Sequence, residues 1–440
     1  MSAIAKFFDF EQNETTLKQE TIAGVTTFAT MAYIIFVNPA ILSTTGMDFG
    51  AVMVATCLAA AIGTLLMGLL ANYPIALAPG MGLNAYFAFS VCGALQIPGQ
   101  TAFGGVFLSG FAFIVLSFFK FREKIIASIP ASLKHAIAVG IGLFIAFIGL
   151  KEGGVLMADP ATFVKLGNLR SLVPLLTMFG LIMTAVLLVR RVSGAILWGI
   201  LATGVLAGLS GMLEYKAIFD LPPSLAPTFA QLDIIGALQT GFLTIVIVFF
   251  FVDLFDTVGT IIAIGERGNF MRDGQLPRAG RALLSDALAT AAGSLFGTST
   301  TTSYIESTAG ISEGARTGFA NMITALLFLS AIFFAPLVKL LGDGIEVDGV
   351  HFHPITAPAL IVVGSMMVVN SLKIDWQDYS ESIPAFLTML GIPLTFSIAD
   401  GMALGFISYP LIKLFSGKGK EVGVAVYILG VVFMARYLLL

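Results

Sequence analysis

Charged side chains are scarce in this sequence: they make up 11% of its 440 residues, whereas hydrophobic residues make up 57%. Soluble proteins carry about 25% charged residues, so this composition excludes an ordinary soluble enzyme and favours a polytopic helical membrane protein. Cysteine is nearly absent, and Cys57 and Cys92 are too few and too isolated for a disulfide framework or a metal site. The net charge is −3, and no basic block indicates nucleic-acid binding.

Motifs of several other protein classes are missing as well. The sequence has no Walker-type phosphate loop, so we do not expect ATP to supply energy. It has no nucleophile–base arrangement and no metal-ligand cluster, and His135, His351 and His353 are expected in loops. We therefore expect neither an enzyme nor a cofactor. We also expect no cleavable signal peptide, because acidic side chains interrupt residues 1–20, where an apolar region would be needed.

Long uncharged stretches predict the membrane spans. The first runs from Thr21 to Met47, and the second stretch, Phe49–Phe119, is too long for one helix at roughly 20 residues per crossing, so it must fold back. Further spans are predicted at residues 135–150, 171–189, 192–213, 234–264, 282–296, 317–341, 356–372, 383–398 and 400–415. A final apolar segment, residues 422–439, either spans the membrane or lies along its surface.

Basic loops predict the orientation. Lys120, Arg122, Lys124 and Lys134 form one basic loop, and such loops are enriched on the cytoplasmic side. A second basic cluster has the same implication: Arg267, Arg272, Arg278 and Arg281. The acidic loop 342–354 is then expected outside. We expect a multi-pass protein of the bacterial inner or plasma membrane with a cytoplasmic N-terminus.

Two segments are unlikely to form continuous helices. In Ala78–Phe89, Pro79, Gly80 and Gly82 stand close together, and Gly297–Gly310 is rich in glycine, threonine and serine. Within a membrane, unwound backbone is tolerated only where protein or a water-filled cavity surrounds it. Interrupted segments at corresponding positions of two halves indicate a transporter with repeats and a site near the membrane midplane.

Acidic residues at membrane depth are the first candidates for the site. Glu306 lies in the second interrupted segment and Asp256 in an apolar span, and ionisable groups at such positions are functional candidates by default. With no cation nearby in sequence, burial favours the protonated form, and a carboxylate also accepts hydrogen bonds from ring N–H groups. The alternative is a structural bond to a buried donor, which we expect for Asp286. Asp253, three residues before Asp256, faces nearly the same way and either lines the site or a water path.

Other side chains in these segments suit a flat heterocycle. Asn84 offers both a donor and an acceptor, which would match a carbonyl beside an N–H, although an amide can instead satisfy frayed backbone. Phe87 and Tyr304 have rings that can stack on the ligand or simply pack. The hydroxyl residues Thr298 to Ser303 can satisfy backbone groups where a helix begins.

Five motifs resemble the purine permeases of the nucleobase–cation symporter superfamily, in the branch that takes up adenine, guanine and hypoxanthine. They are Phe28–Pro39 (FATMAYIIFVNP), Ala78–Phe89 (APGMGLNAYFAF), Val252–Thr260 (VDLFDTVGT), Leu276–Ala282 (LPRAGRA) and Gly297–Gly310. The resemblance covers about residues 6 to 435 and implies about fourteen elements in two inverted repeats of seven. In it, the third and tenth elements are short strand-plus-helix pieces.

The resemblance also implies a core domain and a gate domain. The expected parts are an N-terminal segment (1–20), the core (21–120 and 234–341), the gate (130–215 and 355–416), a linker (221–233) and a C-terminal apolar segment (422–439). The expected substrate contacts are Asp256, Glu306, Asn84, Phe87, Tyr304, Ile305 and Thr30. Asn84 matches the asparagine of guanine/hypoxanthine members, whereas adenine members tend to have threonine there.

The sequence therefore predicts a proton-coupled symporter that imports purine nucleobases, guanine and hypoxanthine above all, by alternating access. Glu306 or Asp256, with Asp253, would carry the proton. Three alternatives stay open: a purine permease that prefers adenine, an anion exchanger or channel of the same fold class, and an intramembrane enzyme. The expected partners are a purine nucleobase, protons and membrane lipid, without nucleic acid, and a homodimer is one of the open assemblies.

Overall fold

The structure is a computed structural model that describes residues 3–117, 129–213, 217–240, 245–272, 275–347 and 349–439. Within these ranges, eight helices are long and apolar enough to cross a membrane: Leu17–Ser43, Phe49–Ala71, Gly99–Ser117, Ala131–Glu152, Leu172–Val189, Ile247–Arg267, Phe319–Gly342 and Ile398–Phe415. Shorter apolar helices accompany them at Met81–Ala94, Ala195–Leu209, Ala357–Lys373 and Val424–Ala435. The prediction of a polytopic helical membrane protein is confirmed.

Side-chain caps explain where the first helices begin. The Thr16 hydroxyl accepts a hydrogen bond from the Gln19 N–H at the start of α2 (Leu17–Met31), and the Asp48 carboxylate accepts one from the Ala51 N–H at the start of α4 (Phe49–Leu66). The predicted span Thr21–Met47 corresponds to the span Leu17–Ser43, within which a short break at Ala32 and Tyr33 separates α2 from α3 (Ile34–Ser43). This break matters below, because Tyr33 lies in it.

The two halves of the chain contain similar elements in the same order. The first half runs α2–α3, α4 with η1 (Met67–Ala71), β1 (Leu77–Pro79) with α5 (Met81–Ala85) and η2 (Tyr86–Ala94), α6 (Gly99–Ser117), α8 (Ala131–Glu152), α9 (Leu172–Val189) and α10 (Ala195–Leu209). The second runs α11 (Ile234–Thr240) with α12 (Ile247–Arg267), α13 (Ala279–Phe296), β4 (Thr301–Ser303) with α14 (Ser307–Ser312), α15 (Phe319–Ala331) with α16 (Ala335–Gly342), α17 (Ala357–Met367) with η5 (Val368–Lys373), α18 (Tyr379–Thr395) and α19 (Ile398–Phe415). Of the predicted span 234–264, the described residues include α11 and α12, and residues 241–244 lie outside the described part.

The two interrupted segments meet at the centre of the molecule. β1 pairs antiparallel with β4, with Leu77 opposite Ser303 and Pro79 opposite Thr301. A short helix follows each strand, as the sequence predicts for strand-plus-helix elements. Antiparallel pairing means that the two elements run in opposite directions, as inverted repeats require. Gly80 permits the approach, because a Cβ there would lie 2.9 Å from the Thr302 side chain.

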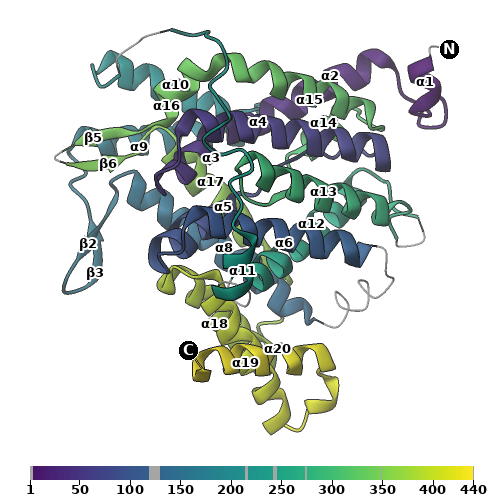
Figure 1. Ribbon diagram of the computed structural model, residues 1–440, viewed down its shortest axis with the longest axis vertical. Helices are drawn as coiled ribbons and strands as arrows, with labels where there is room; N and C mark the ends of the chain where they lie inside the picture. Colours follow the sequence, from purple (N-terminus) through teal and green to yellow (C-terminus); the bar gives the residue numbers. More distant parts are fainter. Residues whose placement is uncertain are drawn as a thin grey trace.

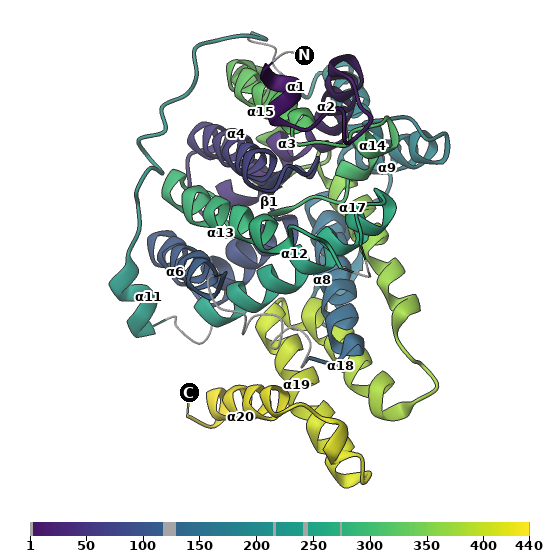
Figure 2. The same cartoon turned by 90° about the vertical axis from the view of Figure 1, so that its right-hand side faces the viewer.

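The helices form two groups that we name by position. In the strand-centred bundle, α2 to α6 and α11 to α16 surround β1 and β4, with α13 packed on α4 and α6 and α15 packed on α2 and α4. In the second bundle, α8 packs on α17 and α18, α9 packs on α10, and α19 packs on α18 and α20 (Val424–Leu439). Figure 2 shows α4, α13 and α6 stacked on one side and α8, α17 and α18 on the other.

A linker joins the halves along the outside of the strand-centred bundle (Figure 2). Its backbone bonds to that bundle, since the Ala230 N–H donates to the Leu295 carbonyl at 2.7 Å and the Asp233 N–H to the Gln100 carbonyl at 3.0 Å. The C-terminal helix α20 lies beside α19 at the edge of the second bundle, and its exposed side is apolar, with Val424, Ile428, Val431 and Leu438.

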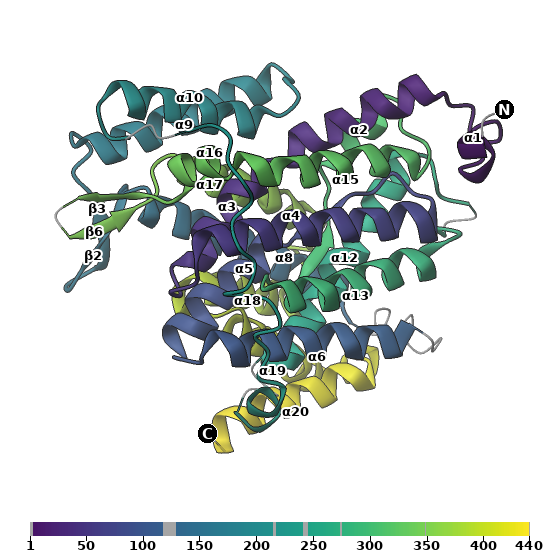
Figure 3. The same cartoon turned by 45° about the horizontal axis from the view of Figure 1, so that its top comes forward.

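The two ends of the molecule differ. At the hairpin end, the hairpins β2–β3 (Leu156–Asp159, Phe163–Leu166) and β5–β6 (Ile345–Val347, Val350–Phe352) project together, on the left of Figures 1 and 3. At the opposite end, the Asn72 side chain donates a hydrogen bond to the Phe8 carbonyl. The Arg278 guanidinium lies there too, 4.4 Å from the centre of the Tyr73 ring, and we call this end the arginine end.

Some predicted loop residues fall elsewhere. Lys120, Arg122 and Lys124 of the predicted basic loop lie outside the described residues. His135 is not in a loop, because α8 already begins at Ala131, directly after Pro130.

Candidate functional site

The strand crossing brings the two predicted acids together. Asp256 comes from α12, and Glu306 stands where β4 gives way to α14. Both side chains are half-buried. The Asp256 carboxylate interacts with the charge of Glu306 and accepts a hydrogen bond from the Thr302 hydroxyl. Across the described ranges, neither carboxylate forms an ion pair with a lysine, arginine or histidine. Each acid does have a hydroxyl donor, Thr302 for Asp256 and Tyr33 for Glu306, so the alternative of a structural bond to a buried donor stays beside the functional one.

Tyr33 holds Glu306 in place. Its hydroxyl donates to Glu306 Oε1 at 2.6 Å, which is the short distance typical of a hydrogen bond to a charged or strongly polar acceptor. The sequence analysis missed this residue, because nothing in the local pattern connects the break after α2 with a carboxylate 273 positions later. Thr30 reaches the same place, but its hydroxyl donates to backbone, to the Thr27 carbonyl at 2.8 Å and the Glu306 carbonyl at 3.4 Å.

Asn84 is a buried amide without a partner. Its side chain is 0% exposed on α5, and neither its nitrogen nor its oxygen forms a hydrogen bond with any described residue. Leaving a buried polar group unpaired costs roughly 1–3 kcal/mol. Asn84 therefore does not satisfy frayed backbone, and its donor and acceptor are both available to a ligand.

The predicted stacking rings are engaged in packing. Phe87 is fully buried, with its ring centre 4.8 Å from that of Phe103 and 6.4 Å from that of Phe249. Tyr304 is also buried, and its hydroxyl donates to the Pro79 carbonyl at 2.5 Å. Ile305, in contrast, is exposed. The contribution of these three residues to substrate binding stays a prediction.

A second pair of acids lies behind the first. Asp253 and Asp286 are both buried and close to one another. Thr257 donates to Asp286 Oδ1 at 2.9 Å, and Thr290 to Asp253 Oδ2 at 3.4 Å, while the other oxygen of each acid has no partner in the described part of the chain. Asp286 thus makes the expected structural hydrogen bond. Asp253 points into the bundle although Asp256, three residues later, is half-exposed.

This arrangement suits binding of a small polar molecule. Among the described residues, no three histidine, cysteine or acidic side chains are placed to hold a metal ion. The polar groups here are two carboxylates and several hydroxyls at the strand crossing, and one unpaired amide on α5, which contacts α12. Together they present acceptors for N–H groups and one donor–acceptor edge, in a place where no protein cation neutralises the acids.

Comparison with known proteins gives consistent relatives. Residues 18–404 match the family model described as the permease family. The chain is 54% identical to a putative permease of Methanocaldococcus jannaschii, with 100% of this chain and 99% of that protein aligned. It is 46% identical to the guanine/hypoxanthine permease PbuG of Bacillus subtilis (99% of each) and 41% identical to the adenine permease AdeP of Escherichia coli (98% and 95%).

Solved structures share the fold at much lower sequence identity. The transmembrane domain of the cyanobacterial bicarbonate transporter BicA aligns with a TM-score of 0.64 at 17% identity, covering 88% of this chain and 97% of that one. A structure of SLC26A9 aligns with a TM-score of 0.62 at 11% identity, covering 91% and 66%. At these identities the likeness concerns the fold alone.

Proposed function

This chain belongs to the nucleobase permease family, and on that premise we propose that it is a proton-coupled symporter that imports purine nucleobases, with guanine and hypoxanthine preferred. The observation that carries the proposal is the pair of acids at the strand crossing without a cationic partner among the described residues, together with the fully buried Asn84 amide, which is unpaired within those residues and lies on α5, a helix that contacts α12. Relatives at 46% and 45% identity carry the name guanine/hypoxanthine permease, and relatives at 41% and 39% carry the name adenine permease.

Different residues of the site bind different polar groups of the purine. Asp256 and Glu306 accept hydrogen bonds from ring N–H groups, because carboxylates are strong acceptors. Asn84 binds the edge on which a 6-oxopurine presents a carbonyl beside an N–H, since its amide offers the complementary donor and acceptor. Because an amide can also pair with the amino group and a ring nitrogen of adenine, the preference for 6-oxopurines rests on the more similar relatives, which carry the name guanine/hypoxanthine permease.

The same acids supply proton coupling. An acid removed from water and without a cationic neighbour is more easily protonated than one in solution. A proton on Glu306 or Asp256 lowers the charge of the loaded site, and Asp253 lies close enough to Asp256 to take part. The hydroxyl of Tyr33 keeps Glu306 oriented in either protonation state, because a hydroxyl can donate to or accept from a carboxyl group.

Alternating access follows from the two bundles. In this proposal the strand-centred bundle acts as the core (21–120 and 234–341), and the second bundle acts as the gate (130–215 and 355–416). They approach closely at Gly82, where an added Cβ would clash with Ile141 of α8. We place the arginine end in the cytoplasm by the enrichment of basic residues in cytoplasmic loops. Relative movement of the bundles then opens the acids to one side at a time.

An anion exchanger or channel is the second candidate, since solved structures of this fold include a bicarbonate transporter and an anion transporter. An anion site requires a cation or free backbone N–H groups, whereas acids occupy the strand crossing here. The discriminating experiment measures uptake of labelled hypoxanthine into proteoliposomes in competition with guanine, adenine, xanthine, uracil and bicarbonate, with and without a protonophore.

We expect guanine to compete best, adenine less well, and uracil and bicarbonate not at all. A protonophore should abolish accumulation above the external concentration. Competition by bicarbonate, or concentrative uptake that survives the protonophore, would contradict the proposal.

A further inference from the structure

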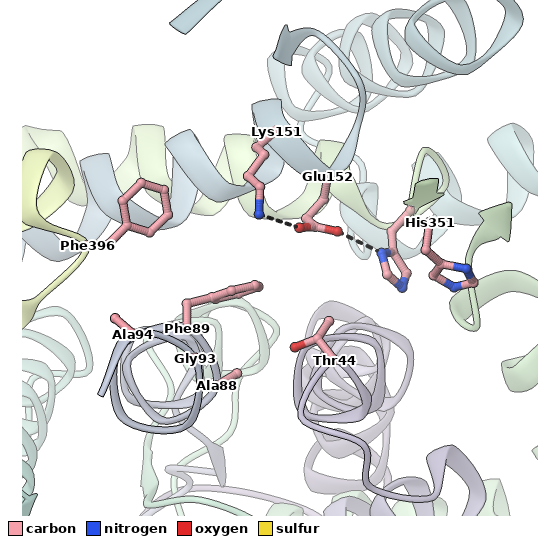
Figure 4. A pocket seen from close by; sticks show the side chains of 10 residues that line it. Thr44, Ala88, Phe89, Gly93, Ala94, Lys151, Glu152, His351 and Phe396 are labelled. Atoms are coloured by element: carbon pink, nitrogen blue, oxygen red, sulfur yellow. Dashed lines mark hydrogen bonds and ion pairs between the residues drawn. The ribbon is translucent and has the colours of Figure 1, made fainter. Parts of the chain in front are cut away.

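A cavity of about 650 Å³ separates the two bundles at the hairpin end (Figure 4). The strand-centred bundle contributes Thr44 and the half-exposed ring of Phe89, and the second bundle contributes Lys151, Glu152 and His353. Figure 4 shows the ring of Phe89 on one wall and the side chains of Lys151 and Glu152 on the other. This volume falls in the range of small-molecule sites, about 300–1,000 Å³.

The cavity is separate from the strand crossing. Neither Asp256 nor Glu306 lines it. Next to it lies a space of only about 10 Å³, enclosed by apolar side chains of both bundles that include Val37, Ile148 and Leu360. A space of that size holds about one water molecule and not a purine. Neither acid of the strand crossing lines this second space, so the cavity at the hairpin end is the space that can hold a purine there.

The polar wall offers a donor beside an acceptor. Lys151 Nζ lies 3.6 Å from Glu152 Oε1, which is longer than the roughly 2.7–2.9 Å of a tight charge-assisted bond. On its other side, Glu152 Oε2 lies 3.0 Å from His353 Nδ1, which fixes the carboxylate. An ammonium has three donors and a carboxylate has about four acceptor sites, so both groups retain capacity for a ligand.

The aromatic wall faces this pair. Lys151 Nζ lies 5.7 Å from the centre of the Phe89 ring, so the cation lies over the face of the ring across the cavity. Phe89 belongs to the same short helical element as Asn84, and it is half-exposed where Phe87 is buried. The ring is thus the accessible aromatic surface of this element, on the cavity side.

We propose that this cavity is an outer binding site that captures a 6-oxopurine before the bundles open toward the acids. The purine replaces the Lys151 ammonium over the face of the Phe89 ring and stacks there, and the exposed lysine side chain moves to the edge of the purine. At that edge the purine carbonyl accepts from Lys151, and the neighbouring N–H donates to Glu152. A 6-oxopurine presents its carbonyl and N–H next to each other, which matches an ammonium and a carboxylate held side by side. The assignment rests on the proposed function, since it takes the transported purine as the ligand.

Matched variants test this site in full-length protein reconstituted in proteoliposomes. Phe89→Ala and Lys151→Met should each raise the KM for hypoxanthine uptake, Phe89→Ala by about tenfold, since base–aromatic stacking contributes roughly 1–3 kcal/mol. The maximal rate should change less than twofold. The controls come from the β2–β3 hairpin at the same end: Phe163→Ala removes a ring that is 86% exposed, and Lys165→Met removes a lysine paired with Asp159 at 3.1 Å. Both controls should keep the wild-type KM.

A binding experiment isolates the outer site from the strand crossing. In the double variant Asp256→Asn/Glu306→Gln, saturation-transfer NMR with hypoxanthine should still report weak binding, and adding Phe89→Ala should remove it. If wild-type protein takes up hypoxanthine but Phe89→Ala and Lys151→Met leave KM unchanged, the outer site is refuted while the proposed function stands. Absence of binding to the double variant would also refute it. Failure of wild-type protein to take up any purine would instead refute the proposed function.

Discussion

Two groups of acids in this protein have opposite surroundings. At the strand crossing, Asp256 and Glu306 have hydroxyl groups as partners, namely those of Thr302 and Tyr33. In the second bundle, Glu381 lies 2.7 Å from the Lys413 ammonium, which is only 4% exposed, and it also accepts a hydrogen bond from Tyr409 at 2.8 Å. Glu421 adds a second carboxylate 3.3 Å from Lys413.

This difference distinguishes an acid with a structural role from an acid that can bind a proton or a ligand. Glu381 is neutralised within the chain, so its group holds α18 and α19 together at fixed geometry. The acids of the strand crossing are not neutralised by any described cation, and a buried charge without compensation is strongly unfavourable. A proton or a ligand N–H must therefore compensate the negative charge that no described cation neutralises. Under the proposed function, this contrast favours the strand crossing as the site that takes up the proton and the purine.

Removing either acid of the strand crossing should have the largest effect. Asp256→Asn and Glu306→Gln preserve shape but remove the charge and one acceptor, so we expect hypoxanthine uptake to fall at least about 100-fold. Uptake into proteoliposomes, normalised to inserted protein, measures the loss. Glu266→Gln is the control, because this exposed acid lies at the end of the same helix α12. Normal uptake by both site variants would contradict the functional role that we assign to the acids of the strand crossing.

Breaking the ion pair of the second bundle should reduce stability and not recognition. Lys413→Met leaves Glu381 without its cation, and breaking a buried pair costs about 3–5 kcal/mol. Thermal unfolding of the purified protein should show a clearly lower midpoint, with an unchanged affinity for hypoxanthine. The double variant Glu381→Gln/Lys413→Met should recover most of the midpoint. An unchanged midpoint for Lys413→Met would mean that this pair is not structural.

Removing the hydroxyl that orients Glu306 should have an intermediate effect. Tyr33→Phe deletes a 2.6 Å hydrogen bond, and such bonds to charged groups contribute about 1.5–3 kcal/mol. We expect uptake to fall by about 10- to 100-fold and its dependence on external pH to shift, because the bond favours one protonation state of Glu306. Tyr427→Phe is the control, since its hydroxyl bonds to the Gly419 carbonyl in the second bundle. Equal pH profiles for wild type and Tyr33→Phe would contradict this role.

Changing the unpaired amide should alter preference more than rate. Asn84→Thr shortens the side chain and removes the paired donor and acceptor, so the ratio of adenine to hypoxanthine uptake should rise about tenfold, the equivalent of roughly 1.4 kcal/mol. Competition between the two labelled purines measures the ratio. A ratio that stays at the wild-type value would remove Asn84 from the recognition of the purine edge.

The sequence predicts features whose cause is local. Pro79, Gly80 and Gly82 interrupt the helix wherever the chain places them, so the strand-plus-helix element could be predicted. Uncharged stretches likewise predicted most spans within a few residues.

Contacts between distant positions could not be predicted in the same way. The bond from Tyr33 to Glu306 joins residues 273 positions apart, and nothing in either segment specifies the other. The same holds for Glu152 at the end of α8, whose carboxylate is held by His353 201 positions later. The burial of Phe87 and the exposure of Phe89 depend on which side of the short helix faces α6 and α12, and tertiary packing decides that.

The most direct test measures protons and purine together. Proteoliposomes that contain the wild-type protein and a pH-sensitive dye inside are given an inward pH gradient, and labelled hypoxanthine is then added. The account predicts that hypoxanthine accelerates acidification of the interior in proportion to its uptake, and that Asp256→Asn and Glu306→Gln abolish both signals. Uptake without any hypoxanthine-dependent acidification, or acidification at the wild-type rate in both variants, would contradict it.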